Sequence, residues 1–232
     1  MMRSECIMNT GRKTRALKAV VFDVDGVLID SIGIILDAYR KTAEMLGLRI
    51  PSEQEVMRLM GGPLMKIVEA LWPNANAELY VKEFRNLFMD EDMVVPEIEG
   101  SVDAVKKIRE SGFRIGVVSG KIRFFIEKHL REAGFNINWF EAIGSFEATK
   151  KHKPDPEPLL YVIDKLKAKP EEAIYVGDAI FDYECARNAE VEYVAVLTGS
   201  SSREELEKLG VRNIIISVAD LPDLLRQSFS LG

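Results

Sequence analysis

Cysteine is scarce in this chain: among 232 residues, the cysteines are Cys6 and Cys185. Their spacing fits neither a metal-binding pair nor a disulfide framework, so we expect a cytoplasmic protein. No apolar run approaches the roughly 20 residues that a membrane-spanning helix needs. The N-terminal segment contains no apolar signal-peptide core, and we expect residues 1–15 to be a disordered leader.

The chain also has no excess of positive charge. The formal net charge is −6, with 29% charged residues. This acidic balance argues against nucleic acid or an anionic membrane as the main partner. A small anionic substrate stays possible, because a metal ion and local lysines can reverse the potential within one cleft. The 47% hydrophobic composition suffices for one core domain with a small insert.

Two aspartates, Asp23 and Asp25, directly follow the apolar run 19–22. The run is rich in β-branched residues, which predicts a strand buried in a parallel sheet. Both aspartates also fit an ordinary turn after a strand. However, open α/β sheets bind ligands at this edge, and two carboxylates so close together need a cation or a shared proton. The stretch therefore predicts a divalent metal site that acts on a phosphate.

A purely helical block follows, since no strand pattern appears between residues 31 and 94. The apolar residues recur at helical spacing, and Ser52 with Glu55 predicts a capping box. Such a block is typical of an inserted lid. We expect an α/β core domain over 16–31 and 95–232 and a helical cap domain over 32–94. The expected cap helices span 32–46, 53–60, 64–71 and 76–89.

From residue 101 onward, strands alternate with helices, which predicts a parallel sheet with helices on both faces. The expected fold is therefore a doubly wound, Rossmann-like α/β core of five or six strands with an inserted all-helical cap. After the first strand, the expected strands span 114–118, 140–143, 173–176, 193–197 and 213–216.

Polar residues follow two further strands of this sheet. Ser119-Gly120-Lys121 follows one, and Gly177-Asp178 follows the other, with Asp182 one helical turn later. In a doubly wound sheet these ends can converge with Asp23 and Asp25. Carboxylates without a histidine or cysteine cluster suit a hard cation, with Mg²⁺ as first choice. Alternatively, Asp178 caps a helix and Asp182 is a solvated first-turn residue.

Two features suggest phosphate binding. Ser119 and Gly120 are expected to open a helix, where backbone amides can hold a phosphate; an ordinary N-cap serine is the alternative. Lys153, in the lysine-rich loop 150–156, would neutralise a phosphoryl group if it reached the cleft. As an isolated signal, that loop also fits solvated surface.

The sequence Asp-Val-Asp-Gly-Val-Leu-Ile-Asp-Ser at 23–31 resembles the first signature of the haloacid dehalogenase superfamily in its phosphatase form. Ser119 after Gly-Val-Val resembles the second signature, and the segment 153–156 the third. Val-Gly-Asp at 176–178 with Asp182 resembles the fourth. The helical insert after the first signature resembles the C1 cap of the phosphoglycolate phosphatase and β-phosphoglucomutase-like branch.

This resemblance implies catalytic roles for two aspartates. Asp23 would be the nucleophile that forms an aspartyl-phosphate. Asp25 would protonate the leaving alcohol and then deprotonate the hydrolytic water. Dehalogenases of the superfamily typically have tyrosine at the position of Asp25, and phosphonate-cleaving members have alanine, so aspartate implies phosphate esters.

The resemblance also implies the ligands. Asp23 and Asp178 would bind Mg²⁺ by side chain, Asp25 by its carbonyl, and Asp182 directly or through water. The side chains of Ser119 and Lys153 would hold the phosphoryl oxygens, with the backbone amides of Gly120, Val24 and Asp25 assisting.

The cap is expected to select the substrate. Gly62, in the loop 61–63, lies where substrate-specificity loops fall in this branch. Lys66 is either a second anion contact or, as we favour, plain surface. The aromatic residues Trp72, Phe84 and Phe88 are expected in the cap core rather than around the substrate.

The sequence thus predicts a Mg²⁺-dependent phosphatase of a small-molecule phosphate monoester, phosphoglycolate-like or a sugar phosphate, acting as a monomer or homodimer. The alternative is a phosphomutase, which shares every core motif and must keep water out. A non-catalytic phospho-acceptor or binding protein is a further alternative, but it explains neither Asp25 nor the helical insert.

Overall fold

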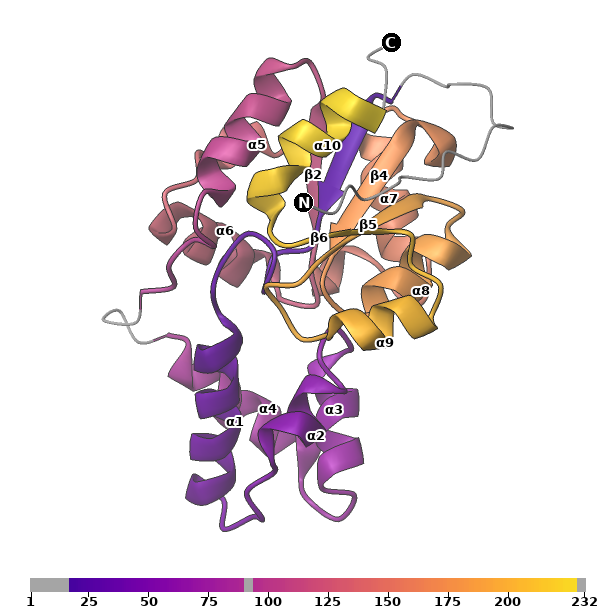
Figure 1. Ribbon diagram of the computed structural model, residues 1–232. Helices are drawn as coiled ribbons and strands as arrows, with labels where there is room; N and C mark the ends of the chain where they lie inside the picture. Colours follow the sequence, from indigo (N-terminus) through magenta and orange to yellow (C-terminus); the bar gives the residue numbers. More distant parts are fainter. Residues whose placement is uncertain (1–16, 90–93, 229–232) are drawn as a thin grey trace, which may run out of the picture.

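The computed structural model describes residues 17–89 and 94–228; the expected leader lies outside this part. Its centre is a parallel sheet of six strands in the order β3-β2-β1-β4-β5-β6 (Figure 1). The chain starts in the middle, winds outward to one edge through β2 and β3, and then to the other through β4, β5 and β6. This confirms the expected doubly wound α/β fold.

The register of the strands brings the loops that follow β1, β2 and β4 next to one another. Phe22, the last residue of β1, is in register with Val117 of β2 and Val176 of β4. The residues after β1, β2 and β4 therefore emerge side by side. β3 spans 142–144 rather than the expected 140–143, and a 3₁₀ turn at 137–139 precedes it. The strands are β1 Ala19–Phe22, β2 Arg114–Val118, β3 Ala142–Gly144, β4 Ala173–Gly177, β5 Glu192–Val196 and β6 Asn213–Ile215.

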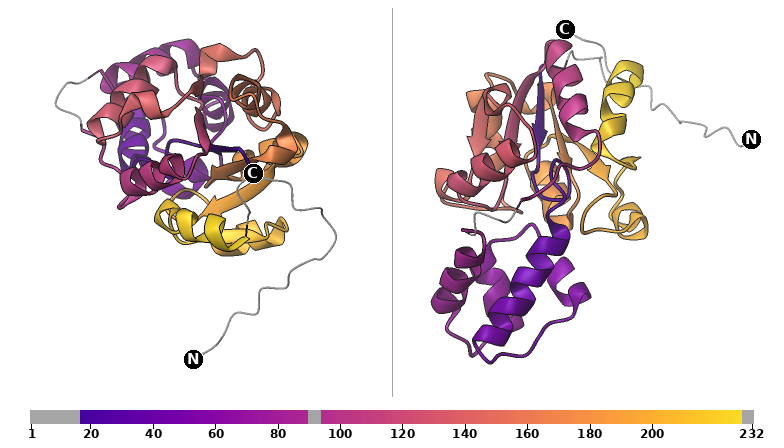
Figure 2. Two further views of the ribbon diagram at one scale, coloured as in Figure 1. Left: turned by 90° about the horizontal axis from the view of Figure 1, so that it is seen from above. Right: turned by 90° about the vertical axis from the view of Figure 1, so that its left-hand side faces the viewer.

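Helices cover both faces of the sheet, because alternate strand residues point to opposite sides. Val20 and Phe22 belong to one apolar cluster, with residues of α5, α6 and α10. Ala19 and Val21 belong to another, with residues of α7, α8 and α9. Figure 2 shows the layers. The helices are α5 Ser101–Glu110, α6 Arg123–Glu132, α7 Glu157–Lys165, α8 Ile180–Asn188, α9 Arg203–Lys208 and α10 Leu221–Ser228.

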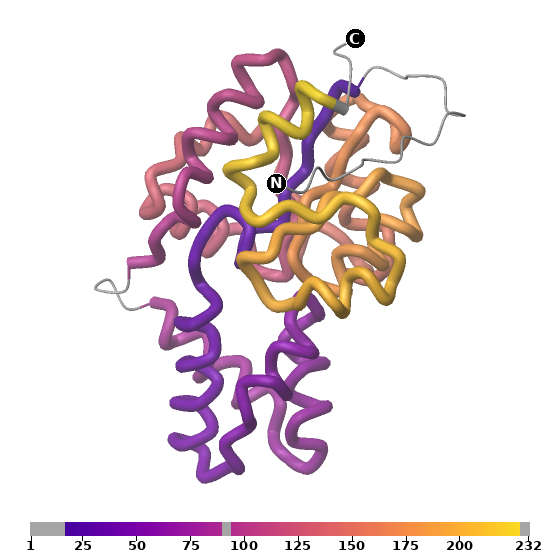
Figure 3. The backbone as a smooth tube through the Cα atoms, viewed as in Figure 1, coloured from indigo at the N-terminus to yellow at the C-terminus, as the bar shows by residue number. Residues whose placement is uncertain are grey.

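Four further helices form a separate bundle at the end of the sheet where β1 ends (Figure 3). Together with Phe125 of α6, they bury an apolar cluster around Tyr39, Val68 and Tyr80. The expected capping box is present: the Ser52 amide donates to Glu55, 2.8 Å away. The helix it opens ends at Met57, earlier than expected. The bundle comprises α1 Ile32–Met45, α2 Glu53–Met57, α3 Leu64–Leu71 and α4 Ala77–Leu87.

None of the helices within the described ranges combines the length and the apolar character that crossing a bilayer requires.

Candidate active site

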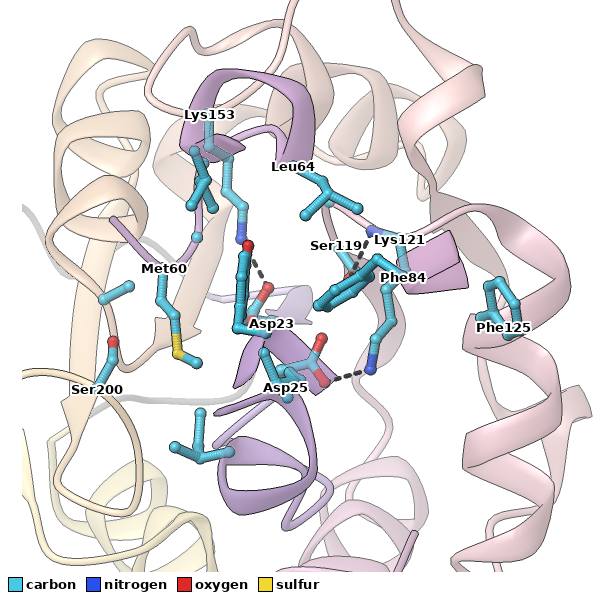
Figure 4. Close-up of a pocket in the computed structure, with 18 of the residues that line it drawn as sticks. Asp23, Asp25, Met60, Leu64, Phe84, Ser119, Lys121, Phe125, Lys153 and Ser200 are labelled. Atoms are coloured by element: carbon cyan, nitrogen blue, oxygen red, sulfur yellow. Dashed lines mark hydrogen bonds and ion pairs between the residues drawn. The ribbon is translucent and has the colours of Figure 1, made fainter. Parts of the chain in front are cut away.

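A cavity of about 140 Å³ lies between the strand-end loops and the helical bundle (Figure 4). Asp23, Asp25, Ser119, Lys153 and Asp178 all line it. The structure thus brings together the polar residues that follow three separate strands.

Asp23 follows β1 directly. Its amide donates to the Val176 carbonyl at 2.8 Å, which fixes Asp23 at the carboxyl end of the central strands. Its Oδ1 accepts a hydrogen bond from Lys153 Nζ at 2.7 Å, and both side chains are buried. Burial raises the pKa of Asp23. Lys153 lowers it, but neighbouring carboxylates add to the rise, and the pKa stays well above its usual range.

Lys153 also donates to Asp182 Oδ1 at 2.7 Å. Burial by itself would lower the pKa of this lysine, but the carboxylates of Asp182 and Asp23 outweigh that effect and raise the pKa. Lys153 therefore stays charged, and it is a buried cation rather than part of a solvated lysine loop.

Asp182 is fully buried, so the alternative of a solvated first-turn residue is wrong. Its Oδ1 also accepts from the Tyr175 hydroxyl at 2.8 Å. Its Oδ2 accepts from the amides of Asp178 and Ala179 at 3.3 and 3.1 Å, at the start of α8. Both oxygens are thus hydrogen-bonded, and Asp182 links the helix start to Lys153.

Asp178 receives two hydrogen bonds at Oδ2, from the amide and hydroxyl of Ser200 at 2.7 and 3.0 Å. Burial and then the charge of Asp182 raise the pKa of Asp178 to about 7, although Ser200 opposes the rise. Gly199 permits this contact, since a Cβ there would lie 2.0 Å from Asp178 Oδ2. The sequence reasoning missed Ser200 and Gly199; their signal is that they follow β5, another strand of the same sheet.

Three of these side chains suit a metal ion. Asp23, Asp178 and Asp182 each offer a carboxylate oxygen, all within 4.8 Å of one another. If all three were ionised, Lys153 would balance one charge and leave two uncompensated in a buried site. A hard divalent cation would neutralise them, and oxygen donors fit its preference. The backbone carbonyl of Asp25 accepts no hydrogen bond from any described residue, so it is also available.

The Asp25 side chain makes different contacts. Its Oδ1 accepts from the Ser31 hydroxyl and from Lys121 Nζ at short distance. Burial would raise the pKa of Asp25, but Lys121 and Ser31 outweigh it and lower the pKa. Lys121 was noted in the sequence as part of a strand end, not as a site residue. Its pairing with Asp25 depends on β1 and β2 being neighbours.

The loop after β2 differs from expectation. α6 begins at Arg123, so Ser119 does not open it. The Ser119 amide donates to the Gly144 carbonyl at 2.9 Å and is not free for a phosphate. Its hydroxyl accepts from the Lys121 amide at 3.2 Å and keeps its own hydrogen to donate. Within the described ranges, the amides of Val24, Asp25 and Gly120 have no hydrogen-bond acceptor.

Some of the cap residues singled out from the sequence line the cavity, and others do not. Gly62 lines the cavity. Lys66 is exposed, pairs with Glu69 at 2.7 Å and does not line the cavity, as favoured from the sequence. Phe84 and Phe88 are buried in the cap cluster as expected, yet they also line the cavity. Trp72 belongs to the cap cluster alone.

Known proteins resemble this chain over most of its length. A family model described as haloacid dehalogenase-like hydrolase matches residues 20–196. Pyrophosphatase PpaX of Listeria welshimeri is 28% identical over 217 residues, covering 92% of this chain and 98% of that protein. Phosphoglycolate phosphatase of Aquifex aeolicus is 30% identical over 187 residues, covering 79% and 86%. The crystal structure of a hydrolase from Pseudomonas syringae has a TM-score of 0.83 at 20% identity, covering 92% of this chain and 100% of that one.

Proposed function

The chain belongs to the haloacid dehalogenase-like hydrolase family, and from this we propose that it is a Mg²⁺-dependent phosphatase of small phosphate monoesters. The relatives confirm the family and the phosphatase class. The observation that carries the proposal is the buried contact between Asp23 and Lys153 beside Asp178, at the floor of a cavity. A carboxylate so placed can attack a phosphoryl group whose charge the lysine offsets.

The reaction starts at the Asp23 carboxylate, which attacks phosphorus to form an aspartyl-phosphate while the ester oxygen leaves. We propose that Asp25 protonates that oxygen and then takes a proton from the water that releases phosphate. Because Lys121 and Ser31 lower the pKa of Asp25 in the ligand-free chain, this role requires that Asp25 takes up a proton when the anionic substrate binds. The Ser119 hydroxyl and Lys153 hold the phosphoryl oxygens, assisted by the free amides of Gly120 and Val24.

Mg²⁺ is the cation we propose for the carboxylates. Asp23 and Asp178 would hold it by side chain, and Asp25 by its carbonyl. When bound, the ion neutralises charge on the phosphoryl oxygens. Because both oxygens of Asp182 are already hydrogen-bonded, we propose that Asp182 positions Lys153 rather than binding the metal; the metal role predicted from the sequence stays a prediction.

The two parts of the fold suggest different roles in catalysis and in substrate selection. We propose that residues 16–31 and 95–232 form the catalytic core and that residues 32–94 are a cap that selects the substrate. A phosphomutase is less favoured, because the cap side of the cavity offers few partners for a sugar. A cytoplasmic location and a monomeric or homodimeric state stay predictions from the sequence.

Phosphate release from a panel of phosphate esters tests the proposal. The panel includes phosphoglycolate and a sugar phosphate, with the anhydride pyrophosphate for comparison, each with Mg²⁺ or with EDTA. We expect Mg²⁺-dependent turnover that is lost in Asp23→Asn and kept in Asp30→Asn, a nearby exposed aspartate. A folded protein that binds Mg²⁺ but releases no phosphate from any member would contradict it.

A further inference from the structure

The cavity has a polar floor and an apolar roof. Its floor carries the carboxylates and lysines described above. On the cap side, Tyr39 and Arg85 are the only polar side chains among the lining residues of the part of the chain that the structure describes. Figure 4 shows Leu64 and Phe84 among the side chains that line the cavity together with Asp23. The apolar lining includes Ile32, Ile35, Leu64, Phe84 and Phe88 of the cap and Phe125 of α6.

The lining offers little to a charged leaving group. Lys153 is bound to two carboxylates, and Lys121 is paired with Asp25. Among the lining cations, Lys121 and Lys153 form ion pairs, whereas Arg85 forms none with any residue of the described ranges. A second phosphate or a carboxylate on the substrate would therefore depend on Arg85.

The cavity also offers few hydrogen-bond partners to the hydroxyl groups of a sugar. Enclosed hydroxyls that lose water without gaining hydrogen-bond partners oppose binding. With Tyr39 and Arg85 as the polar side chains of the roof, most hydroxyls of a sugar would face hydrocarbon. An alkyl group, in contrast, would bury its surface against the roof.

We infer that the phosphate ester cleaved in this cavity has an apolar leaving group, so that the substrate class is an alkyl or similarly apolar monophosphate. This inference rests on the proposed phosphatase function. Phosphoryl transfer is unchanged: the P–O bond to the leaving group breaks, and that oxygen takes its proton from Asp25. The cap side chains act by burying the alkyl chain.

A series of n-alkyl phosphates tests the inference, because chain length changes burial with little effect on the chemistry of the leaving oxygen. We expect kcat/KM with Mg²⁺ to rise from ethyl to hexyl phosphate by about fourfold for each buried methylene, until the cavity is filled. Hexyl phosphate should then exceed phosphoglycolate, pyrophosphate and glucose 6-phosphate.

A matched pair of variants locates the effect. Leu64 and Met65 are both half-buried at the start of α3, but only Leu64 lines the cavity. Leu64→Gln should flatten the dependence on chain length, and Met65→Gln should preserve it. Equal slopes in both variants would contradict the inference.

A preference for phosphoglycolate over hexyl phosphate would overturn the inference and leave the proposed function intact, whether or not Arg85→Met abolishes that preference. A preference for glucose 6-phosphate would do the same. Absence of phosphate release from every ester would instead overturn the proposed function, and the inference with it.

Discussion

Lys153 Nζ lies 2.7 Å from Oδ1 of Asp182, a carboxylate that is itself held by Tyr175 and by two amides at the start of α8. The same ammonium donates to Asp23. The start of one helix thus fixes the lysine that faces the proposed nucleophile. The two aspartates that follow β4 therefore have different partners: Asp182 accepts a hydrogen bond from Lys153, and Asp178 does not.

The first prediction follows from that difference in partners. Asp178→Asn should weaken Mg²⁺ binding by at least about 10- to 100-fold, because that is the typical loss when even a group that only supports a metal ligand is removed. Asp182→Asn should lower kcat while changing Mg²⁺ affinity much less, because it displaces Lys153. Calorimetric Mg²⁺ titration and steady-state kinetics of both variants measure this. Equal losses of affinity would mean that Asp182 is a metal ligand.

Removing the buried lysine should destabilise the folded chain. Lys153→Met leaves buried carboxylates without their cation, which we expect to cost about 3–5 kcal/mol of unfolding free energy in EDTA. Lys150→Met, in the same loop but exposed, should change stability little. Urea denaturation measures both. A stability of Lys153→Met equal to that of the parent chain would show that the buried ion pairs contribute nothing.

The raised pKa of Asp178 predicts how stability depends on pH without metal. Its pKa is about 7 in the folded chain, against 3.8 for an ordinary aspartate. Between these values the folded chain holds a proton that the unfolded chain has lost. Stability in EDTA should therefore fall between about pH 4 and pH 7, by on the order of 4 kcal/mol from this group.

Mg²⁺ should reverse that trend, since it binds the ionised carboxylates. Thermal unfolding at pH values from about 4 to 8, with Mg²⁺ or EDTA, measures both effects. We expect the Mg²⁺-induced rise in Tm to be larger at pH 8 than at pH 5. Asp178→Asn should weaken the pH dependence in EDTA; an unchanged pH profile in this variant would assign the effect to another group.

A glycine beside the metal site provides a steric test. A Cβ at Gly199 would lie 2.0 Å from Asp178 Oδ2, so Gly199→Ala must displace the carboxylate or the loop. We expect a loss of about 1–3 kcal/mol in stability and weaker Mg²⁺ binding. Gly33→Ala, in α1 with open space around it, should be neutral or stabilising. Full Mg²⁺ affinity in Gly199→Ala would contradict the close contact.

The sequence predicts the residues that directly follow apolar strands, because strand and carboxylate are adjacent in the chain. Asp23 and Asp178 were found in this way, and the doubly wound sheet followed from alternation. Ser200 and Gly199 were missed because their contact with Asp178 depends on which strands are neighbours. The apolar cavity wall was missed for another reason: Phe84 has the same helical spacing whether it faces a core or a cavity.

The most direct test of the account is to trap the phosphoryl group on Asp23. Rapid acid quench during turnover with Mg²⁺, followed by mass spectrometry of the digested protein, measures this. We predict a phosphoryl group on the peptide that contains Asp23, labile to hydroxylamine and absent from Asp23→Asn. Turnover with no such adduct, or an adduct on another residue, would contradict the proposed role of Asp23.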